Sequence, residues 1–518
     1  MSNRWNPTFV AGLQTELDVR AYTSRLLGDD PALVLHGGGN TSLKGWWKRA
    51  DGAAVRCLYV KGSGADLARV EPADFTPVAL DPARALLDGP ALADDAFMAA
   101  LAPLVLRPGA PRPSIETLMH AVLPASHVEH THADNVLALV NTESGERIAR
   151  AVFGERAPLV PFRHSGFELA RACADVFAQA ATDATIGLVL AFHGVVAFGN
   201  DAESSYRNML CLAQQAEDHL RDRGAWDLPR AVAPALNESD ALDLARLRRT
   251  LSAIAGFPLV LVRDNDPTVM GFVTRNDLAE VALQGPPTPQ HSVFTKRLPC
   301  LGLDVARYAA EYREYLASAA PAGMAPARLP DAAARVVLDR RLGLIGAGLD
   351  CRNAGVTAQV YRHDIEIVSR ANAHDRYLAL PPDQVLAGEI HYGGFERKRR
   401  AAAATVEPLL GALILVLDDG DDANACAHAC RHAGADVFVR PASRDLRAIV
   451  LELALAHGGV DLIASAKPLA TVPDAIGAIL EQSPFAPAAG AARVLSHRDL
   501  QANAMQVLTP VLRTASPR

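Results

Sequence analysis

The sequence predicts an α/β protein with more than one domain. At 518 residues the chain is too long for one hydrophobic core, and roughly 150 residues per domain suggests about three domains. The apolar runs "LYVKG" (58–62) and "IGLVLAF" (186–192) are typical of buried strands. Between and after them, "SIETLMHAVL" (114–123) and "SSYRNMLCLAQQAEDHL" (204–220) have the apolar spacing of helices.

Three segments follow one another along the chain. Residues 1–237 alternate strand-like and helix-like stretches and form the first predicted domain. Residues 238–405 form a middle α+β region, which contains the Pro-Ala-rich stretch 317–334. Residues 406–518 form a last α/β segment, which opens on the strand-like "VEPLLGALILVLDD".

Composition excludes several classes of protein. The net charge is −7 and no dense basic stripe occurs, which argues against a nucleic acid as partner. No apolar run approaches the roughly 20 residues of a membrane span, and the polar N-terminus does not resemble a signal peptide. The seven cysteines do not have the spacing of a disulfide framework, which indicates reduced thiols. We therefore expect a cytoplasmic protein without membrane or nucleic-acid partners.

The stretch "HVEHTHADN" (127–135) is a candidate metal site. Side chains alternate along a strand, so His130 and His132 would point to the same face. Imidazole is the commonest transition-metal ligand, and two imidazoles supply half of a tetrahedral zinc site. His127 should face the other side, as a structural or surface residue. An H-x-H pattern alone is weak evidence.

Two further residues are candidates for the same site. His193 ends a buried strand before a glycine, where a polar side chain needs a partner; a core histidine bonded to backbone is the alternative. Glu116 lies in "APRPSIETLMHAV" (110–122), at the start of a predicted helix. Ser114 would cap that helix, but capping does not explain Glu116.

Two glycine-rich loops precede these motifs: "LHGGGNTSLK" (35–44) and "YVKGSGADL" (59–67). Glycine lets backbone N–H groups approach an anion closely, together with hydroxyl and amide side chains. Neither loop has the spacing of a P-loop or of a dinucleotide fingerprint. Taken singly, each loop is also compatible with a tight turn.

In this order the motifs resemble the class II aldolase/adducin superfamily, over roughly residues 15–235. The spellings "VKGSGADL", "RPSIETLMH", "HVEHTHAD" and "GPPTPQHSVFTKRLP" are most similar to the bifunctional rhamnulose-1-phosphate aldolase/short-chain dehydrogenase proteins. The resemblance implies an α/β/α sandwich around a mixed, largely antiparallel sheet, assembled as a homo-oligomer, specifically a tetramer.

The resemblance also implies roles for particular residues. It makes His130, His132 and His193 the ligands of Zn²⁺ or another divalent metal ion. Glu116 would be the general acid/base, and also a metal ligand when no substrate is bound. The implied contacts to a substrate phosphate are Gly39, Asn40, Ser63, Gly64 and Ser114. The related aldolases have a second serine where this chain has Ile115, so one hydroxyl contact is lost.

The implied activity is that of a metal-dependent aldehyde-lyase. It would cleave a ketose 1-phosphate of the rhamnulose or fuculose type into dihydroxyacetone phosphate and an aldehyde, through a metal-bound enediolate. One alternative is a sugar-phosphate epimerase of the same superfamily, but those enzymes carry aspartate where this chain has Glu116. Another is a non-catalytic, adducin-like binding module, but such proteins lack the metal histidines.

The segment 406–518 resembles the dehydrogenase domain of the bifunctional proteins, in a degenerate and truncated form. The turn that should hold a pyrophosphate reads Asp418, Asp419, Gly420, Asp421 and Asp422. Carboxylates repel phosphate at a helix N-terminus, and Tyr392 is the last tyrosine, so no catalytic tyrosine follows. We expect a partial Rossmann-like domain without NAD and without dehydrogenase activity.

The middle region offers no chemistry that spacing alone reveals. Its motif "TPQHSVFTK" (288–296) could reach an active site through Thr288, His291 or Lys296. Only the family resemblance suggests this.

Overall fold

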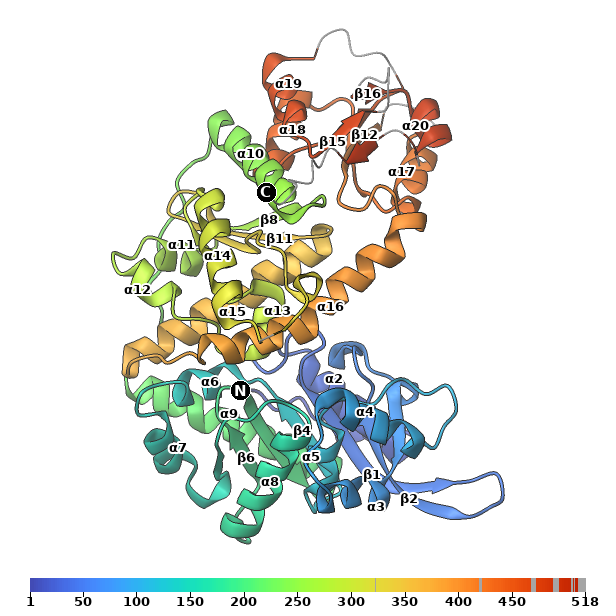
Figure 1. Ribbon diagram of the computed structural model, residues 1–518, viewed down its shortest axis with the longest axis vertical. Coiled ribbons are helices and arrows are strands. Elements are labelled where there is room, and N and C mark those ends of the chain that lie inside the picture. The colour runs from blue at the N-terminus through green and yellow to red at the C-terminus, as the bar shows by residue number, and fades with distance from the viewer. Residues whose placement is uncertain are drawn as a thin grey trace. The chain divides into compact units, whose positions relative to one another are not determined.

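The computed structural model describes residues 1–321, 323–418, 422–466, 472–487, 493–504, 506 and 508–510 (Figure 1). The chain forms two compact units. Unit 1 comprises Met1–Leu228 and Glu366–Ala379, and unit 2 comprises Pro229–Ile365 and Leu380–Arg518. The predicted domain boundaries after residues 237 and 405 stay a prediction. In the part of the chain that is described, every helix is too short or too polar to cross a membrane.

Unit 1 is built on a seven-stranded sheet in the order β3-β2-β1-β4-β7-β6-β5. Neighbouring strands are antiparallel, except for β5 and β6, which are parallel. The strands are β1 (Asn40–Lys48), β2 (Ala54–Lys61), β3 (Phe75–Ala79), β4 (His127–Thr131), β5 (Leu159–Val160), β6 (Gly187–Leu190) and β7 (Gly194–Gly199). Strand β4 lies at the centre of the sheet.

Helices cover both faces of this sheet (Figure 1). One face packs against α2 (Glu16–Gly28), α6 (Asp134–Val140), α7 (Gly145–Phe153) and α9 (Ala202–Asp222). The other face packs against α3 (Leu80–Ala85), α4 (Asp94–Leu101), α5 (Thr117–Val122) and α8 (Phe167–Ala180). The short helix α1 (Pro7–Val10) precedes them. The predicted α/β/α sandwich around a largely antiparallel sheet is therefore confirmed.

Unit 2 contains two larger sheets. The first has the order β8-β11-β10-β9 and is antiparallel apart from the β9–β10 pair. Its strands are β8 (Val260–Asp264), β9 (Cys300–Leu301), β10 (Val336–Asp339) and β11 (Gly343–Gly348). The helices of this region are α10 (Glu238–Ala255), α11 (Pro267–Val273), α12 (Leu278–Ala282), α13 (Pro289–Thr295), α14 (Val305–Ala319), α15 (Cys351–His374) and α16 (Pro382–Val406).

The second sheet of unit 2 is fully parallel, in the order β13-β12-β14-β16. Its strands are β12 (Leu413–Asp418), β13 (Asp436–Pro441), β14 (Leu462–Ala464) and β16 (Val494–Leu495), and a separate pair is β15 (Phe485–Pro487) with β17 (Leu508–Pro510). Strand β13 follows β12 in the sequence and lies on one side of it, whereas β14 comes next and lies on the other side of β12. This order is that of doubly wound folds.

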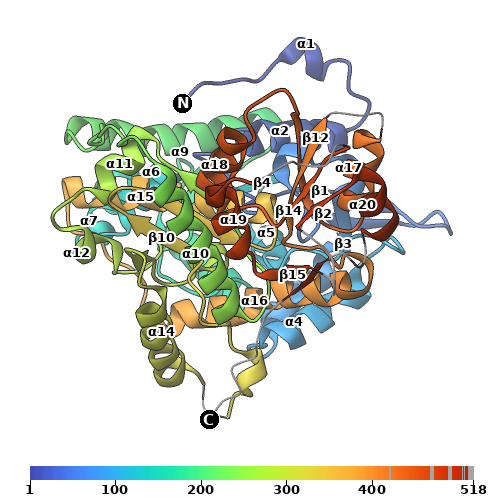
Figure 2. The ribbon, with the colours of Figure 1, turned by 90° about the horizontal axis from the view of Figure 1, so that it is seen from above.

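Helices flank this parallel sheet on both faces (Figure 2). They are α17 (Ala423–His432) and α20 (His497–Asn503) on one face, and α18 (Leu446–His457) and α19 (Asp474–Glu481) on the other. This parallel sheet with helices on both faces is consistent with the predicted Rossmann-like domain. In the acidic turn, Asp419, Gly420 and Asp421 lie outside the described residues. Asp422 accepts a hydrogen bond from Nε of Arg498 at 2.8 Å.

A buried ion pair joins helix α10 to the residue that precedes β14 in unit 2. Arg248 of α10 donates from Nη1 and Nη2 to the two carboxylate oxygens of Asp461, at 2.9 and 2.7 Å. Both side chains are almost completely buried. Arg248 also donates to the carbonyl oxygens of Leu259 and Gly411, and Asp461 accepts from the backbone N–H of Leu413. The C-terminal segment therefore packs against the middle region through a charged and fully bonded contact.

We predict that Asp461→Ala strongly destabilises unit 2. The substitution leaves the Arg248 guanidinium buried without its carboxylate, which costs about 3–5 kcal/mol. Circular dichroism during denaturant unfolding should show a transition at lower denaturant. Glu146→Ala is the control, because its ion pair with Arg150 is exposed and should contribute less than about 1 kcal/mol. Equal unfolding midpoints for the two variants would contradict the role of the buried pair.

Candidate metal centre

Strand β4 presents its histidines in the middle of the sheet, between β1 and β7. His130 is completely buried, on the face that α5 covers. His132 follows the end of the strand, where its backbone N–H donates to the carbonyl oxygen of Leu33 at 3.0 Å. His127 stays outside the histidine group and lies 3.1 Å from the Ser126 hydroxyl through Nδ1. It is buried, so of the two predicted readings the structural one fits.

His193 comes from the tight turn between β6 and β7. The preceding residue, Phe192, has φ of +54°, which is rare outside glycine. Its backbone N–H donates to the side-chain oxygen of Asn141 at 3.2 Å. At Gly194 a Cβ atom would come within 2.2 Å of the carbonyl oxygen of Thr131. Glycine is therefore needed here, since only a bare backbone lets this turn lie against the end of β4.

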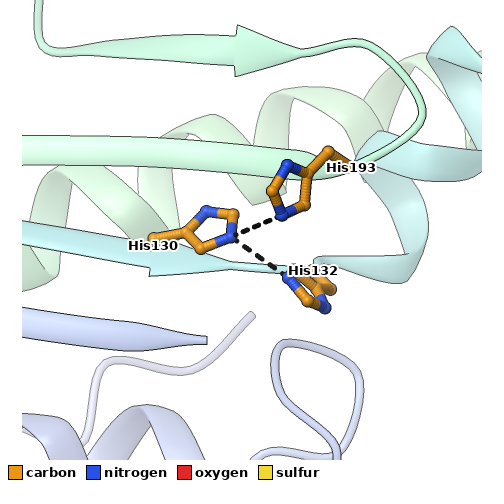
Figure 3. A group of neighbouring side chains, drawn as sticks. All are labelled: His130, His132 and His193. Carbon is orange, nitrogen blue, oxygen red and sulfur yellow. Dashed lines mark hydrogen bonds between the residues drawn. The ribbon is translucent and has the colours of Figure 1, made fainter. Parts of the chain in front are cut away.

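The three imidazoles converge through their Nε2 atoms (Figure 3). Nε2 of His130 lies 3.1 Å from Nε2 of His132 and 3.3 Å from Nε2 of His193. Zn–N bonds of about 2.0–2.1 Å in a tetrahedral site place ligand nitrogens about 3.3 Å apart. The spacing therefore fits a zinc-sized ion bound by three imidazoles.

The protonation of His130 also fits a metal ligand. Its Nδ1 lies 3.1 Å from the carbonyl oxygen of Val195, which can only accept, so the proton belongs on Nδ1. The Nε2 lone pair then faces the other two histidines, as in metal sites whose ligand histidine is oriented by a backbone carbonyl. Burial lowers the pKa of His130 to about 4, which keeps this imidazole neutral.

Glu116 lies beside the three histidines, immediately before α5. Its Oε1 is 3.0 Å from Nε2 of His193, and its Oε2 is 3.7 Å from Nε2 of His130. The hydroxyl of Ser165 donates to Oε1 at 3.1 Å. Burial alone would raise the pKa of this carboxyl, but its histidine neighbours and the Asn40 amide hold the pKa well below its usual range. The Glu116 carboxylate therefore lies against the buried group of three imidazoles.

Two of the five predicted phosphate contacts, Asn40 and Ser114, bond to Glu116, and a third, Gly39, directly precedes Asn40. The Asn40 amide donates to Glu116 and, at 3.3 Å, to the Ser114 hydroxyl. That hydroxyl also accepts the backbone N–H of Glu116 at 3.2 Å. Helix α5 has Glu116 as its N-cap residue and no side-chain cap hydrogen bond, so the predicted helix cap by Ser114 is wrong. Gly39 has φ of +59°, and a Cβ there would lie 2.7 Å from the carbonyl oxygen of His130. Asn40 and Ser114 therefore hold Glu116 as well as lining its surroundings.

The other two predicted contacts, Ser63 and Gly64, lie on an exposed loop after β2. The backbone N–H of Ser63 donates to the carbonyl oxygen of Arg112 at 2.8 Å, so that amide is already occupied. Gly64 has φ of +82° and open space around its Cα. Ile115 packs against the core on the α5 side of the sheet and offers no hydroxyl.

Several polar residues of the site were not predicted from the sequence. Lys61 is buried between the two glycine-rich loops and donates to the carbonyl oxygens of Gly37 and Ala65, at 3.4 and 2.6 Å. Burial lowers its pKa to about 8. Ser165 carries no sequence signal, since it is one serine in a loop. His120 was recognisable, because it follows Glu116 by four residues and so shares its helix face.

Comparisons with known proteins agree with this architecture. Residues 19–220 match the family described as class II aldolase and adducin N-terminal domain, and residues 238–399 match the family described as aldolase class II, second domain. A Bacillus subtilis protein named as the uncharacterized oxidoreductase YuxG is 28% identical over 400 residues. That match covers 73% of this chain but only 57% of the relative's length.

Solved structures with class II aldolase folds match the N-terminal part. The N-terminal class II aldolase domain of a conserved protein from Thermoplasma acidophilum is 33% identical, with a TM-score of 0.40, and covers 43% of this chain and 100% of that chain. L-fuculose-1-phosphate aldolase from Thermus thermophilus is 19% identical, with a TM-score of 0.28 and the same two coverages. The chain therefore contains two consecutive class II aldolase domains, followed by a dehydrogenase-like region.

We predict that the protein binds one divalent ion per chain through His130, His132 and His193. His132→Ala removes one of three ligands and should weaken binding at least about 100-fold, beyond the usual cost of losing an outer contact. Dialysis against zinc with a competing chelator, followed by elemental analysis, measures this. His127→Asn is the control, because asparagine can keep the contact to Ser126. Equal metal contents in both variants would refute the site.

Proposed function

We propose that the protein is a zinc-dependent aldolase that cleaves a ketose 1-phosphate into dihydroxyacetone phosphate and an aldehyde. The observation that carries the proposal is the Glu116 carboxylate, 3.0 Å from Nε2 of His193 at the point where three imidazoles converge. A metal ion and a carboxylate at one point suit proton transfer beside a polarised carbonyl. The match of residues 19–220 to the class II aldolase and adducin N-terminal domain supports the same reaction class.

The three histidines would hold the ion and leave part of its coordination shell open to substrate. Neutral imidazoles do not reduce the ion's charge, and three of them leave at least one position free. When bound, the ion supplies Lewis-acid polarisation of a ketose carbonyl oxygen. The carbonyl of Val195 would hold the His130 ring in its ligand orientation before substrate arrives.

Glu116 would move the proton at C3 of the sugar. In cleavage the C4 hydroxyl loses a proton as it becomes the aldehyde and the C3–C4 bond breaks; the carboxylate would take up one proton and deliver it to C3, so that no net proton is gained or lost. In synthesis it would remove the proton from C3. Asn40 and Ser165 donate hydrogen bonds to its two oxygens. These donors hold the carboxylate in one orientation and favour its ionised form, which is the form that accepts a proton.

The glycine-rich loops would bind the phosphate. The Ser63 hydroxyl, the Gly64 backbone N–H and the nearby Gly39, Asn40 and Ser114 form the proposed surroundings. The Lys61 ammonium group donates hydrogen bonds to a backbone carbonyl oxygen of each loop and contributes a positive charge. The proposal further includes a homo-oligomer, as the family resemblance implies, and a cytoplasmic location, as the cysteine pattern indicates.

We predict aldol cleavage of L-rhamnulose 1-phosphate, L-fuculose 1-phosphate or a related ketose 1-phosphate by the zinc-loaded protein. Dihydroxyacetone phosphate is measured by its reduction with a coupling dehydrogenase. Glu116→Gln keeps the shape but cannot exchange the proton, so kcat should fall about 10²–10⁴-fold. Its metal content should stay close to that of the unsubstituted protein.

Other products of the same assay would favour the alternatives. An isomeric sugar phosphate without dihydroxyacetone phosphate would identify an epimerase. A protein that binds no divalent ion and turns over no ketose 1-phosphate would fit a non-catalytic binding module.

We also predict that residues 406–518 bind neither NAD nor NADP. The proposal rests on the acidic turn 418–422, whose carboxylates oppose a pyrophosphate. The test matters because the Bacillus subtilis relative is named an oxidoreductase. Calorimetric titration of NAD⁺, NADH and NADPH should show no saturable heat. Micromolar binding that Asp418→Ala or Asp422→Ala altered would contradict this interpretation of the turn.

A further inference from the structure

We propose that His120 is a positioning residue, which fixes the side-chain amide of Asn40 and through it the carboxylate of Glu116. The inference rests on the proposed role of Glu116 in proton transfer. It assigns a function to a buried histidine that lies outside the metal-ligand group.

Four side chains form one chain of hydrogen bonds. The Ser42 hydroxyl lies 2.8 Å from Nδ1 of His120. Nε2 of His120 contacts Oδ1 of Asn40, and Nδ2 of Asn40 donates to Oε2 of Glu116. Ser42 and His120 are completely buried, and Asn40 and Glu116 are 4% and 6% exposed. Solvent therefore offers these groups almost no alternative partners.

The direction of every bond follows from the last one. An ionised carboxylate can only accept, so Asn40 must turn its NH₂ group toward Glu116. The Asn40 oxygen then faces His120, which must carry its proton on Nε2. Nδ1 is left as an acceptor and takes the Ser42 hydroxyl proton. All three donors thus point toward Glu116, and hydrogen bonds aligned in this way polarise one another.

The opposite tautomer of His120 shows why the residue matters. With the proton on Nδ1, the Asn40 oxygen would face a bare nitrogen lone pair, and the amide would be driven to rotate. Rotation would turn the Asn40 oxygen toward the Glu116 carboxylate, placing two acceptors against each other. Asparagine alone does not choose between these orientations, since both ends of its amide have similar size.

The position of His120 on its helix supports a role in this network. Its neighbours Leu118, Met119 and Ala121 belong to the hydrophobic core on this face of the sheet, and His120 is a completely buried polar residue among them. Its backbone N–H donates to the carbonyl oxygen of Glu116 at 3.3 Å, one turn earlier. Burying an imidazole costs free energy unless its nitrogens are bonded, and here both nitrogens are used.

Two substitutions of His120 separate positioning from packing. In His120→Gln the amide nitrogen takes the place of Nε2 and keeps the donor to Asn40. In His120→Asn the amide lies where Nδ1 was, so the contact to Ser42 survives and the one to Asn40 is lost. We expect His120→Gln to retain most of kcat and His120→Asn to lose about 100-fold, the scale of a misplaced catalytic group. KM, zinc content and unfolding midpoint should differ little between them.

A second readout does not depend on activity. Cobalt(II) loaded in place of zinc reports the ligand environment through its visible absorption. A displaced Glu116 should change that spectrum in His120→Asn, and His120→Gln should resemble the unsubstituted protein. If no ketose 1-phosphate is cleaved, the proposed function fails, but this spectral comparison still tests the positioning. Ser42→Ala, a smaller change, should shift the spectrum and kcat in the same direction but less.

Two results would overturn the proposal. Equal losses of kcat in both His120 variants, in proportion to equal losses of thermal stability, would assign His120 a packing role. Unchanged kcat and unchanged cobalt spectra in His120→Asn would show that Asn40 keeps its orientation without the histidine. If His120→Asn does not fold, the decision passes to Ser42→Ala, where an unchanged spectrum and kcat would count against the network.

Discussion

Burial of polar side chains on both faces of β4 is the constraint on which unit 1 depends. Adjacent residues of this central strand, Glu129 and His130, point to opposite faces and are both completely buried. Such groups are tolerated only with partners. Glu129 accepts from Arg20 of α2 at 2.5 Å and from Ser205 of α9 at 3.0 Å. This contact ties the strand to both helices on one face, and His130 is thereby held at a fixed depth on the other.

The second half of the site depends on backbone geometry. His193 reaches His130 because the turn before it places Phe192 at positive φ, a conformation that costs of order 1–3 kcal/mol outside glycine. The bond from Phe192 to Asn141 and the bare backbone of Gly194 support that turn. Residues 63 positions apart therefore meet with Nε2 atoms 3.3 Å apart. The strained backbone at Phe192 is consistent with a turn whose role is to bring His193 to the other two histidines.

The sequence predicted what depends on periodicity and motif. Alternation in β4 placed His130 and excluded His127, and the family resemblance supplied His193 and Glu116. The sequence could not show that Asn40 and Ser114 point polar atoms toward Glu116. Nor could it show that the backbone N–H of Ser63 donates to the carbonyl oxygen of Arg112. Asn40 and Ser63 meet partners from segments distant in sequence, so only tertiary packing decides those contacts. His120 needed both kinds of information: helical spacing gave its face, and only the fold gave its partners.

The C-terminal segment shows how a fold and its chemistry separate. Its strand order and helix layers depend on apolar residues in strands and helices, whereas a nucleotide site would depend on a few loop residues. Changes confined to loop residues can therefore alter the second without altering the first. One face of this sheet is also completed by Ala241 and Ala245 of α10, beside the Arg248–Asp461 pair. Since that core includes residues of the middle region, the segment does not bury its own apolar surface alone, and its fold depends on contacts to α10 as well as on its own strands.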